Sequence, residues 1–223
     1  MSVPVSRRAA LRGAVLLGAV AGASALTQLG GGSGARAVAT RVDQPVIANC
    51  ATWGARPPSS PVSVVQSRPN KIIVHHTAFP NTTDYSLAKA YANSRDIQNL
   101  HMDGNGWLDS GQHFTNSRGG HLTEGRHGSL YALLHGRTMV QGAHCVGQNS
   151  QAIGIENDGT YLTVQPPAAL WNSLITFCAF TCQQYGIAPT EIYGHKDFNN
   201  TQCPGLLHGR LPELRAAVAA RLG

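Results

Sequence analysis

The sequence predicts a mixed α/β domain in which helices pack against a central β-sheet. Three observations lead to this fold class: short β-branched runs that end in polar residues, longer segments with helical spacing of apolar residues, and the alternation of the two along the chain. With 42% hydrophobic and 13% charged residues among 223, the chain is apolar enough to bury a core and too apolar to be intrinsically disordered. No apolar run reaches the roughly 20 residues of a membrane helix, and no heptad or solenoid repeat is present. We therefore expect no membrane span, no coiled coil and no fibre.

Residues 1–39 have the pattern of a signal peptide. The paired arginines Arg7 and Arg8 give a basic start, and a weakly apolar stretch of Ala, Gly, Val and Leu follows over residues 13–26. A Gly- and Ser-rich spacer then leads to Ala-Val-Ala at 37–39, which fits a cleavage site of small residues. The arginine pair predicts export by a twin-arginine pathway and a location outside the cell or in its envelope. A disordered N-terminal arm is the alternative.

Export changes the charge argument for the remaining domain, residues 40–223. The predicted signal peptide holds four arginines and no acidic residue, so it carries four of the six formal positive charges and leaves about +2 on the domain. Recognition of nucleic acid requires a concentrated basic face, and the domain shows none. We therefore expect no nucleic-acid partner.

The first half of the domain contains strand, helix and turn signals in that order. Residues 40–70 are rich in Pro, Ser and Arg, and we expect them to wrap the domain without regular structure. The β-branched run 71–76 predicts a buried strand with two histidines at its carboxyl end. The segment 84–102 lacks Pro and Gly and predicts a helix. Short strands are expected over 111–115 and 122–124, joined by a turn that contains two glycines.

The second half continues the alternation. A strand is expected over 152–156, and two prolines then precede a helix that runs to about residue 185 with one apolar stripe. A last short strand over 191–195 and a helix over 211–222 complete the chain. These elements predict a single domain with a central mixed sheet flanked by helices.

Two remote segments carry residues suited to metal binding. His195 and Cys203 lie eight residues apart across an Asn-Asn-Thr loop, so a curled loop can bring both side chains to one point. One histidine from the strand end at His75 and His76 would complete the three ligands of a catalytic Zn²⁺ site that leaves a fourth position for water. Cys203 would then be the unpaired member of five cysteines, held as a thiolate. The alternatives are a packed or exposed histidine and a disulfide at Cys203.

A larger set of motifs carries a resemblance to a known family. The motifs are Trp53-Gly54-Ala55-Arg56-Pro57-Pro58, Val74-His75-His76-Thr77-Ala78, Gly106-Trp107-Leu108-Asp109-Ser110-Gly111-Gln112-His113-Phe114, Gly142-Ala143-His144, Gly147-Gln148-Asn149, Ile153-Gly154-Ile155-Glu156, and His195-Lys196-Asp197 with Thr201-Gln202-Cys203-Pro204-Gly205. In this order they cover residues 50–205 and resemble the peptidoglycan recognition protein / N-acetylmuramoyl-L-alanine amidase type 2 family. One such motif would mean little, but seven in order are specific.

The resemblance implies the fold, cofactor and substrate of that family. It implies a Zn²⁺-dependent amidase that cleaves the bond between the lactyl group of N-acetylmuramic acid and L-alanine in peptidoglycan. The implied zinc ligands are His75, His195 and Cys203. His75 is preferred to His76 because the family places its ligand directly after the apolar strand, and His76 would point to the other side of the pleat. We expect a monomer whose partner is peptidoglycan or a muropeptide.

The sequence departs from the family at one catalytic position. Many members carry a tyrosine where this chain has Gln112, and an amide cannot accept and return a proton near neutral pH. Other amidases of this fold use the glutamate of a Gly-Ile-Glu segment, which here is Glu156. We therefore expect Glu156 to be the general base and Gln112 to position water or substrate, with a surface glutamate at a strand end as the alternative.

Three further residues have roles implied by the resemblance. Thr201 would donate a hydrogen bond to the oxyanion, or its hydroxyl would only close the loop. His144 and Asn149 resemble residues that line the family's glycan-peptide groove, with packing as the alternative for each.

The four other cysteines allow two disulfides after export. We expect Cys50 and Cys145 each to bond Cys178 or Cys182, because the latter two lie four apart on one helix face and would strain the helix if bonded to each other. Four buried thiols are the alternative.

The sequence is compatible with three classes of protein. The leading one is the exported zinc amidase, and the second is a non-catalytic module that only binds muropeptides. The third is an exported, disulfide-stapled protein without zinc. Cys203 favours the enzyme, whereas Gln112 keeps the binding module open.

Overall fold

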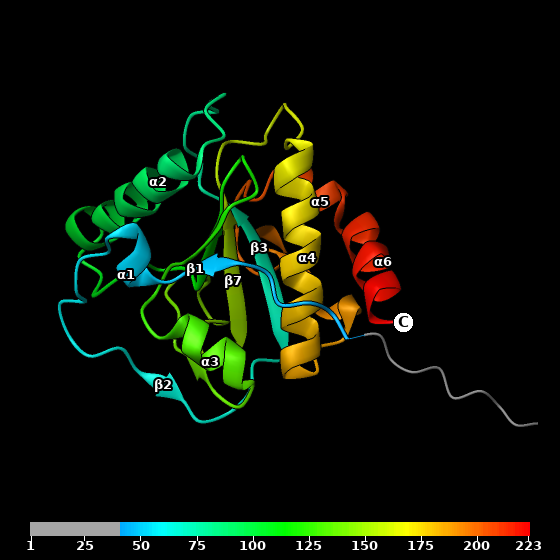
Figure 1. Cartoon of the computed structure of the whole chain (residues 1–223), viewed down its shortest axis with the longest axis horizontal. Coiled ribbons are helices and arrows are strands. Elements are labelled where there is room, and N and C mark those ends of the chain that lie inside the picture. The colour runs from blue at the N-terminus through cyan, green and yellow to red at the C-terminus, as the bar shows by residue number, and fades with distance from the viewer. Residues whose placement is uncertain (1–40) are drawn as a thin grey trace, which may run out of the picture. The chain divides into compact units, whose positions relative to one another are not determined.

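The β-branched run that ends in two histidines forms β3 (Lys71–His76), an inner strand of the central sheet. A computed structural model describes residues 41–223, and the predicted signal peptide lies outside the described residues. The sheet has six strands in the order β1-β5-β4-β7-β3-β8. Their bounds are β1 Ile47–Ala48, β4 Phe114–Asn116, β5 Leu122–Glu124, β7 Ala152–Asn157 and β8 Ile192–Gly194. Figure 1 labels β1, β7 and β3 of this sheet. Within this six-stranded sheet only β4 and β5 pair antiparallel, so the sheet is mixed, as predicted.

Two long helices cover one face of this sheet. Helices α4 (Ala168–Tyr185) and α6 (Leu211–Leu222) lie side by side in Figure 1, and the main core fills the space between them and the sheet. Phe114 of β4 meets Phe177 of α4 with ring centroids 4.9 Å apart. The prolines at the start of both helices set the backbone for helix entry, because their missing N–H groups would have no intrahelical partner there.

The opposite face of the sheet carries helix α2 (Leu87–Asn99). Ser94 of α2 hydrogen-bonds Thr123 of β5, with 2.8 Å between the hydroxyl oxygens. The strand register aligns Thr123 with Thr115, Thr115 with Glu156, and Glu156 with His75, so these four side chains share the α2 face. Because side chains alternate along a strand, Ile72 and Val74 point instead into the core under α4.

Several smaller elements complete the described chain. They are α1 (Cys50–Trp53), β2 (Val64–Val65), a π-helical turn (Leu100–Gly104) that extends α2, α3 (Ser129–His135), β6 (Met139–Val140), two 3-10 turns (Pro189–Glu191 and His195–Asp197) and α5 (Leu206–Gly209). Strands β2 and β6 pair into a separate two-stranded sheet. Within residues 41–223, no helix is both long enough and apolar enough to span a bilayer.

The predicted disulfides are wrong, since all five cysteines are free thiols in the described structure. Cys178 and Cys182 belong to α4 and are part of the main core, whereas Cys145 packs with Ile73 in a small cluster of its own. Along β3 the side chains of Ile72 and Val74 face α4, and the side chain of Ile73 between them faces the other side of the sheet. The sheet therefore separates Cys145 from Cys178 and Cys182. Cys50 instead donates a hydrogen bond to the carbonyl of Gly125, with Sγ 3.4 Å from the oxygen.

Candidate metal centre

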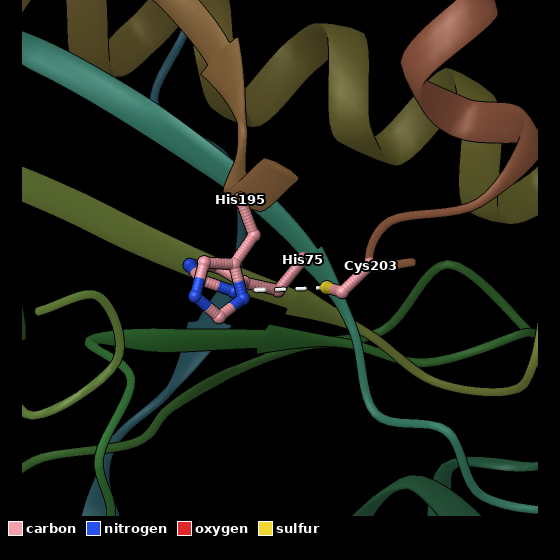
Figure 2. A group of neighbouring side chains, drawn as sticks. All are labelled: His75, His195 and Cys203. Atoms are coloured by element: carbon pink, nitrogen blue, oxygen red, sulfur yellow. Dashed lines mark hydrogen bonds between the residues drawn. The ribbon is translucent and has the colours of Figure 1, made fainter. Parts of the chain in front are cut away.

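Three side chains from remote parts of the sequence converge at the carboxyl ends of β3 and β8. His75 ends β3, His195 begins the 3-10 turn after β8, and Cys203 lies in the loop that follows. One donor atom from each, two nitrogens and a sulfur, lies within 4.8 Å of the others. Figure 2 shows the three side chains pointing toward one another, with Nδ1 of His75 3.8 Å from Sγ of Cys203. Each of the three was predicted as a metal ligand.

Backbone contacts hold the loop that carries Cys203. The N–H of Lys196 donates to the carbonyl of Cys203 at 2.9 Å, which closes the loop onto the turn at His195. The N–H of Cys203 donates to Oγ1 of Thr201 at 3.2 Å, and the N–H of His76 donates to Sγ of Cys203 at 3.3 Å. The sulfur is thus fixed beside β3 rather than exposed.

Burial sets the protonation of the donors before any metal binds. It lowers the pKa of His75 well below its ordinary value, so the imidazole is neutral and keeps a free lone pair. Burial raises the pKa of the Cys203 thiol to about 12, so binding of a metal must displace this proton. His76 lies outside the donor set, because its Nδ1 accepts the N–H of Tyr161 at 3.3 Å.

A cavity of about 290 Å³ opens beside the three donors. Its walls include Glu156 and Thr201, and His101 and Trp107 line it as well. Glu156 aligns with His75 across the β3–β7 pair, which places both side chains on the cavity face of the sheet. Burial raises the pKa of Glu156 to about 8. A carboxyl group with this pKa can exchange a proton near neutral pH.

Of the other predicted site residues, only His144 lines this cavity. Gln112 is buried, its amide donates to Oγ1 of Thr115 at 2.9 Å, and it is not among the lining residues. Asn149 uses its side-chain oxygen to accept the N–H groups of His144 and Cys145, at 2.8 and 2.9 Å. Asn149 lines a neighbouring hollow of about 400 Å³, and His144 lines both spaces.

His101 is a lining residue that sequence reasoning missed. It sits in the π-helical turn after α2, and its Nδ1 accepts the N–H of Gly111 at 3.0 Å. Its ring lies against Trp107, with centroids 4.8 Å apart. In the sequence it is a polar residue near the end of a predicted helix. A widened helical turn, which often marks functional sites, has no composition signal of its own.

Acid is expected to destabilise the metal-free protein partly through two buried histidines. Burial lowers the pKa of His101 and of His113 from 6.5 to about 4. Between these values the unfolded chain binds protons that the folded chain rejects, so each histidine removes about 1.4 kcal/mol of stability per pH unit on acidification. Urea unfolding of the His113→Asn variant from pH 7 to pH 4 should show a shallower loss than wild type. Equal slopes would contradict this assignment.

The fold and this donor set together define a class of protein. It is an α/β domain with a His/His/Cys centre at the carboxyl edge of a mixed sheet, beside a cavity that holds one glutamate. The family model of N-acetylmuramoyl-L-alanine amidases matches residues 65–206. The chain therefore belongs to the N-acetylmuramoyl-L-alanine amidase family, as its motifs predicted.

Curated relatives include both amidases and recognition proteins. The chain is 31% identical to peptidoglycan-recognition protein LB of Drosophila melanogaster over 160 residues, which is 71% of this chain and 62% of that protein. It is 31% identical to peptidoglycan-recognition protein SC2 of Drosophila simulans over 69% of this chain and 77% of the relative. It is 29% identical to the N-acetylmuramoyl-L-alanine amidase of Homo sapiens over 69% of this chain, but spans only 25% of the human protein.

Solved structures confirm the fold. Drosophila PGRP-LB matches with a TM-score of 0.63 and 30% identity over 74% of this chain and 89% of the other. A point mutant of the same protein was solved in complex with tracheal cytotoxin, and it matches with a TM-score of 0.62 and 29% identity over 71% and 88% of the two chains. The amidase LysC of Clostridium intestinale matches with a TM-score of 0.62 and 25% identity over 79% and 99%.

Proposed function

We propose that this protein is an exported zinc-dependent N-acetylmuramoyl-L-alanine amidase that hydrolyses the lactyl–L-alanine amide bond of peptidoglycan. One observation carries the proposal: His75, His195 and Cys203 meet beside a cavity although 128 residues separate the first from the last. The basic, then weakly apolar, N-terminal segment supports export to the cell envelope or beyond.

The chemistry of the donor set fits Zn²⁺. Two neutral imidazoles and one thiol are ligands that zinc prefers, and three protein ligands leave one position for water or substrate, as in catalytic zinc sites. A bound zinc ion supplies a Lewis acid that polarises the amide carbonyl and makes water more acidic.

The side chains around the cavity would perform the proton transfers. Glu156 accepts the proton of the attacking water as the new C–O bond forms, and it returns a proton to the departing amine as the C–N bond breaks. A cation beside Glu156 favours its ionised form, which counteracts the burial that raises its pKa to about 8. The hydroxyl of Thr201 accepts the N–H of Cys203 and keeps its own proton free to donate toward the cavity.

The substrate groove would extend beyond the cavity. The hollow of about 400 Å³ shares Trp107, Ala143, His144 and His195 with the cavity, so the two form one continuous depression that suits an extended glycan-peptide. A relative of this chain was solved with tracheal cytotoxin, which supports a muropeptide ligand. Gln112 contributes to the proposed groove only indirectly, because it is buried beside Gly125 and lines neither the cavity nor the neighbouring hollow.

The activity test uses the mature domain, residues 40–223, and purified sacculi. Incubation should release peptides whose new amino terminus is L-alanine, detectable by mass spectrometry, and a chelator should abolish their release. Restoring zinc should restore release. Zinc-loaded protein that releases no such termini would contradict the proposal.

A non-catalytic binding module is the second candidate, favoured by Gln112 in place of the tyrosine of many family members. Under this alternative, sacculi would retain the domain with or without chelator and no amino termini would form. The same incubation therefore separates the two candidates in one experiment.

A further inference from the structure

The ring of His144 contacts the candidate metal ligand His75 at Nε2, the ring nitrogen that does not face Cys203. Nδ1 of His144 is 3.0 Å from Nε2 of His75, and the two rings are nearly perpendicular, with centroids 5.0 Å apart. The other nitrogen of His144, Nε2, is 3.3 Å from the carbonyl oxygen of Ala152 on β7. Both nitrogens of His144 are therefore engaged within the protein.

Two glycines leave the space that this ring occupies. A Cβ atom on Gly154 would lie 2.5 Å from Cγ and 2.6 Å from Nδ1 of His144. A Cβ atom on Gly142 would lie 2.6 Å from Cδ2 of the same ring. Neither distance is sterically possible, so any larger residue at either position would displace His144 from His75.

The hydrogen bonds determine which nitrogen carries the proton, first in the ring of His144 and then in the ring of His75. A backbone carbonyl only accepts, so Nε2 of His144 must carry a proton, and in the neutral ring Nδ1 is then the acceptor. His75 must therefore carry its own proton on Nε2 and donate it to His144. The lone pair of His75 is left on Nδ1, the atom that faces Sγ of Cys203.

We propose that His144 is a positioning residue of the metal centre, which holds His75 in the Nε2–H tautomer and directs its Nδ1 at the ion. The proposal rests on the metal centre of the proposed function. It replaces the groove-binding role expected for His144, because no ring nitrogen remains for a substrate. Partners of this kind raise the basicity of a ligand and fix its ring, and their loss costs about 10- to 100-fold in metal affinity.

The second imidazole has an equivalent partner. Oδ1 of Asn199 lies 3.1 Å from Nε2 of His195, while its amide nitrogen donates to the carbonyls of Val146 and Phe198 at 3.4 and 3.0 Å. Those two donations orient the amide so that Oδ1 faces His195. Both ligand rings thus donate through Nε2, His75 to the buried His144 and His195 to the partly exposed Asn199, which is the arrangement expected when Nδ1 binds the metal.

The test compares two variants of the same shape. His144→Asn places a carbonyl oxygen near the position of Nδ1 and can still accept from His75, whereas His144→Leu cannot. We expect His144→Leu to bind zinc about 10- to 100-fold more weakly than wild type, in competition with a chromophoric chelator, and His144→Asn to stay within a few-fold of wild type. Equal losses in both variants would indicate a role in packing alone and overturn the proposal.

A second measurement uses the metal-free wild-type domain, so it requires neither zinc nor a substituted protein. Long-range ¹H–¹⁵N spectra of the metal-free wild-type domain should show His75 as the Nε2–H tautomer, and the Nδ1–H form would overturn the proposal.

Gly154→Ala should lower zinc affinity as His144→Leu does. Zinc affinities and tautomers are measured without substrate, so an inactive protein that passes these tests would refute the amidase and leave the role of His144 supported. A wild-type domain that binds no zinc would refute both.

Discussion

Replacement of Cys203 by serine is expected to abolish zinc binding and to lower amidase turnover at least about 1,000-fold, a loss of about 4 kcal/mol of transition-state stabilisation. The thiolate is the only anionic ligand in the set of three, and a serine hydroxyl does not ionise in its place. The measurement is the zinc content of the purified domain by atomic absorption, followed by the release of L-alanine amino termini from sacculi.

Cys50→Ser is the matched control for this substitution. Cys50 is also a buried thiol, it donates to the carbonyl of Gly125, and a serine hydroxyl can keep that hydrogen bond. It lines neither the cavity nor the neighbouring hollow. Stoichiometric zinc in Cys203→Ser, or loss of zinc in both variants, would contradict the assignment of Cys203 as a ligand.

The long, strongly patterned elements of the fold could be predicted from the sequence. The helix over 211–222 matches α6 at both ends, and the strand over 71–76 matches β3. The short elements were missed, because each has too few residues to show a period: α3, β6 and α5, and also β1, α1 and β2 within residues 40–70, which were expected to lack regular structure. Helix α2 is shorter than predicted, since the side chain of Ser86 accepts the N–H of Lys89 and starts the helix there.

The sequence indicated the three donors and the lining residues Glu156 and Thr201, but not how the donors are held. Composition and spacing left a disulfide at Cys203 open, and the resemblance to a family made the His/His/Cys set specific. The hydrogen bonds that hold the donor His75 were not predictable, because they depend on which nitrogen of His144 faces which neighbour. The predicted disulfides failed for a related reason. The spacing of Cys178 and Cys182 along a helix does not show on which face of the sheet Cys145 lies.

Glu156→Gln is the second substitution with a large expected effect. It should lower turnover about 100- to 10,000-fold and leave zinc affinity nearly unchanged, because a general base contributes to proton transfer and the three metal donors remain. Glu213→Gln is the control, since that carboxylate pairs with Arg210 on the helical face of the protein that lies away from the cavity. Near-normal turnover of Glu156→Gln on sacculi would remove Glu156 from the mechanism.

The stability of the metal-free protein distinguishes a partly buried Glu156 with a raised pKa from a fully exposed carboxylate. Its pKa rises from 4.5 in the unfolded chain to about 8 in the folded protein, so between these values the folded state binds a proton that the unfolded state has released. Stability should therefore fall by about 1.4 kcal/mol per pH unit from this group as the pH rises from 4.5 to 8. Glutamine cannot titrate, so urea unfolding of Glu156→Gln should show a flatter pH dependence than wild type across that window. Parallel curves would mean that Glu156 does not titrate with a raised pKa in the folded, metal-free protein, and would contradict its burial beside the candidate metal centre.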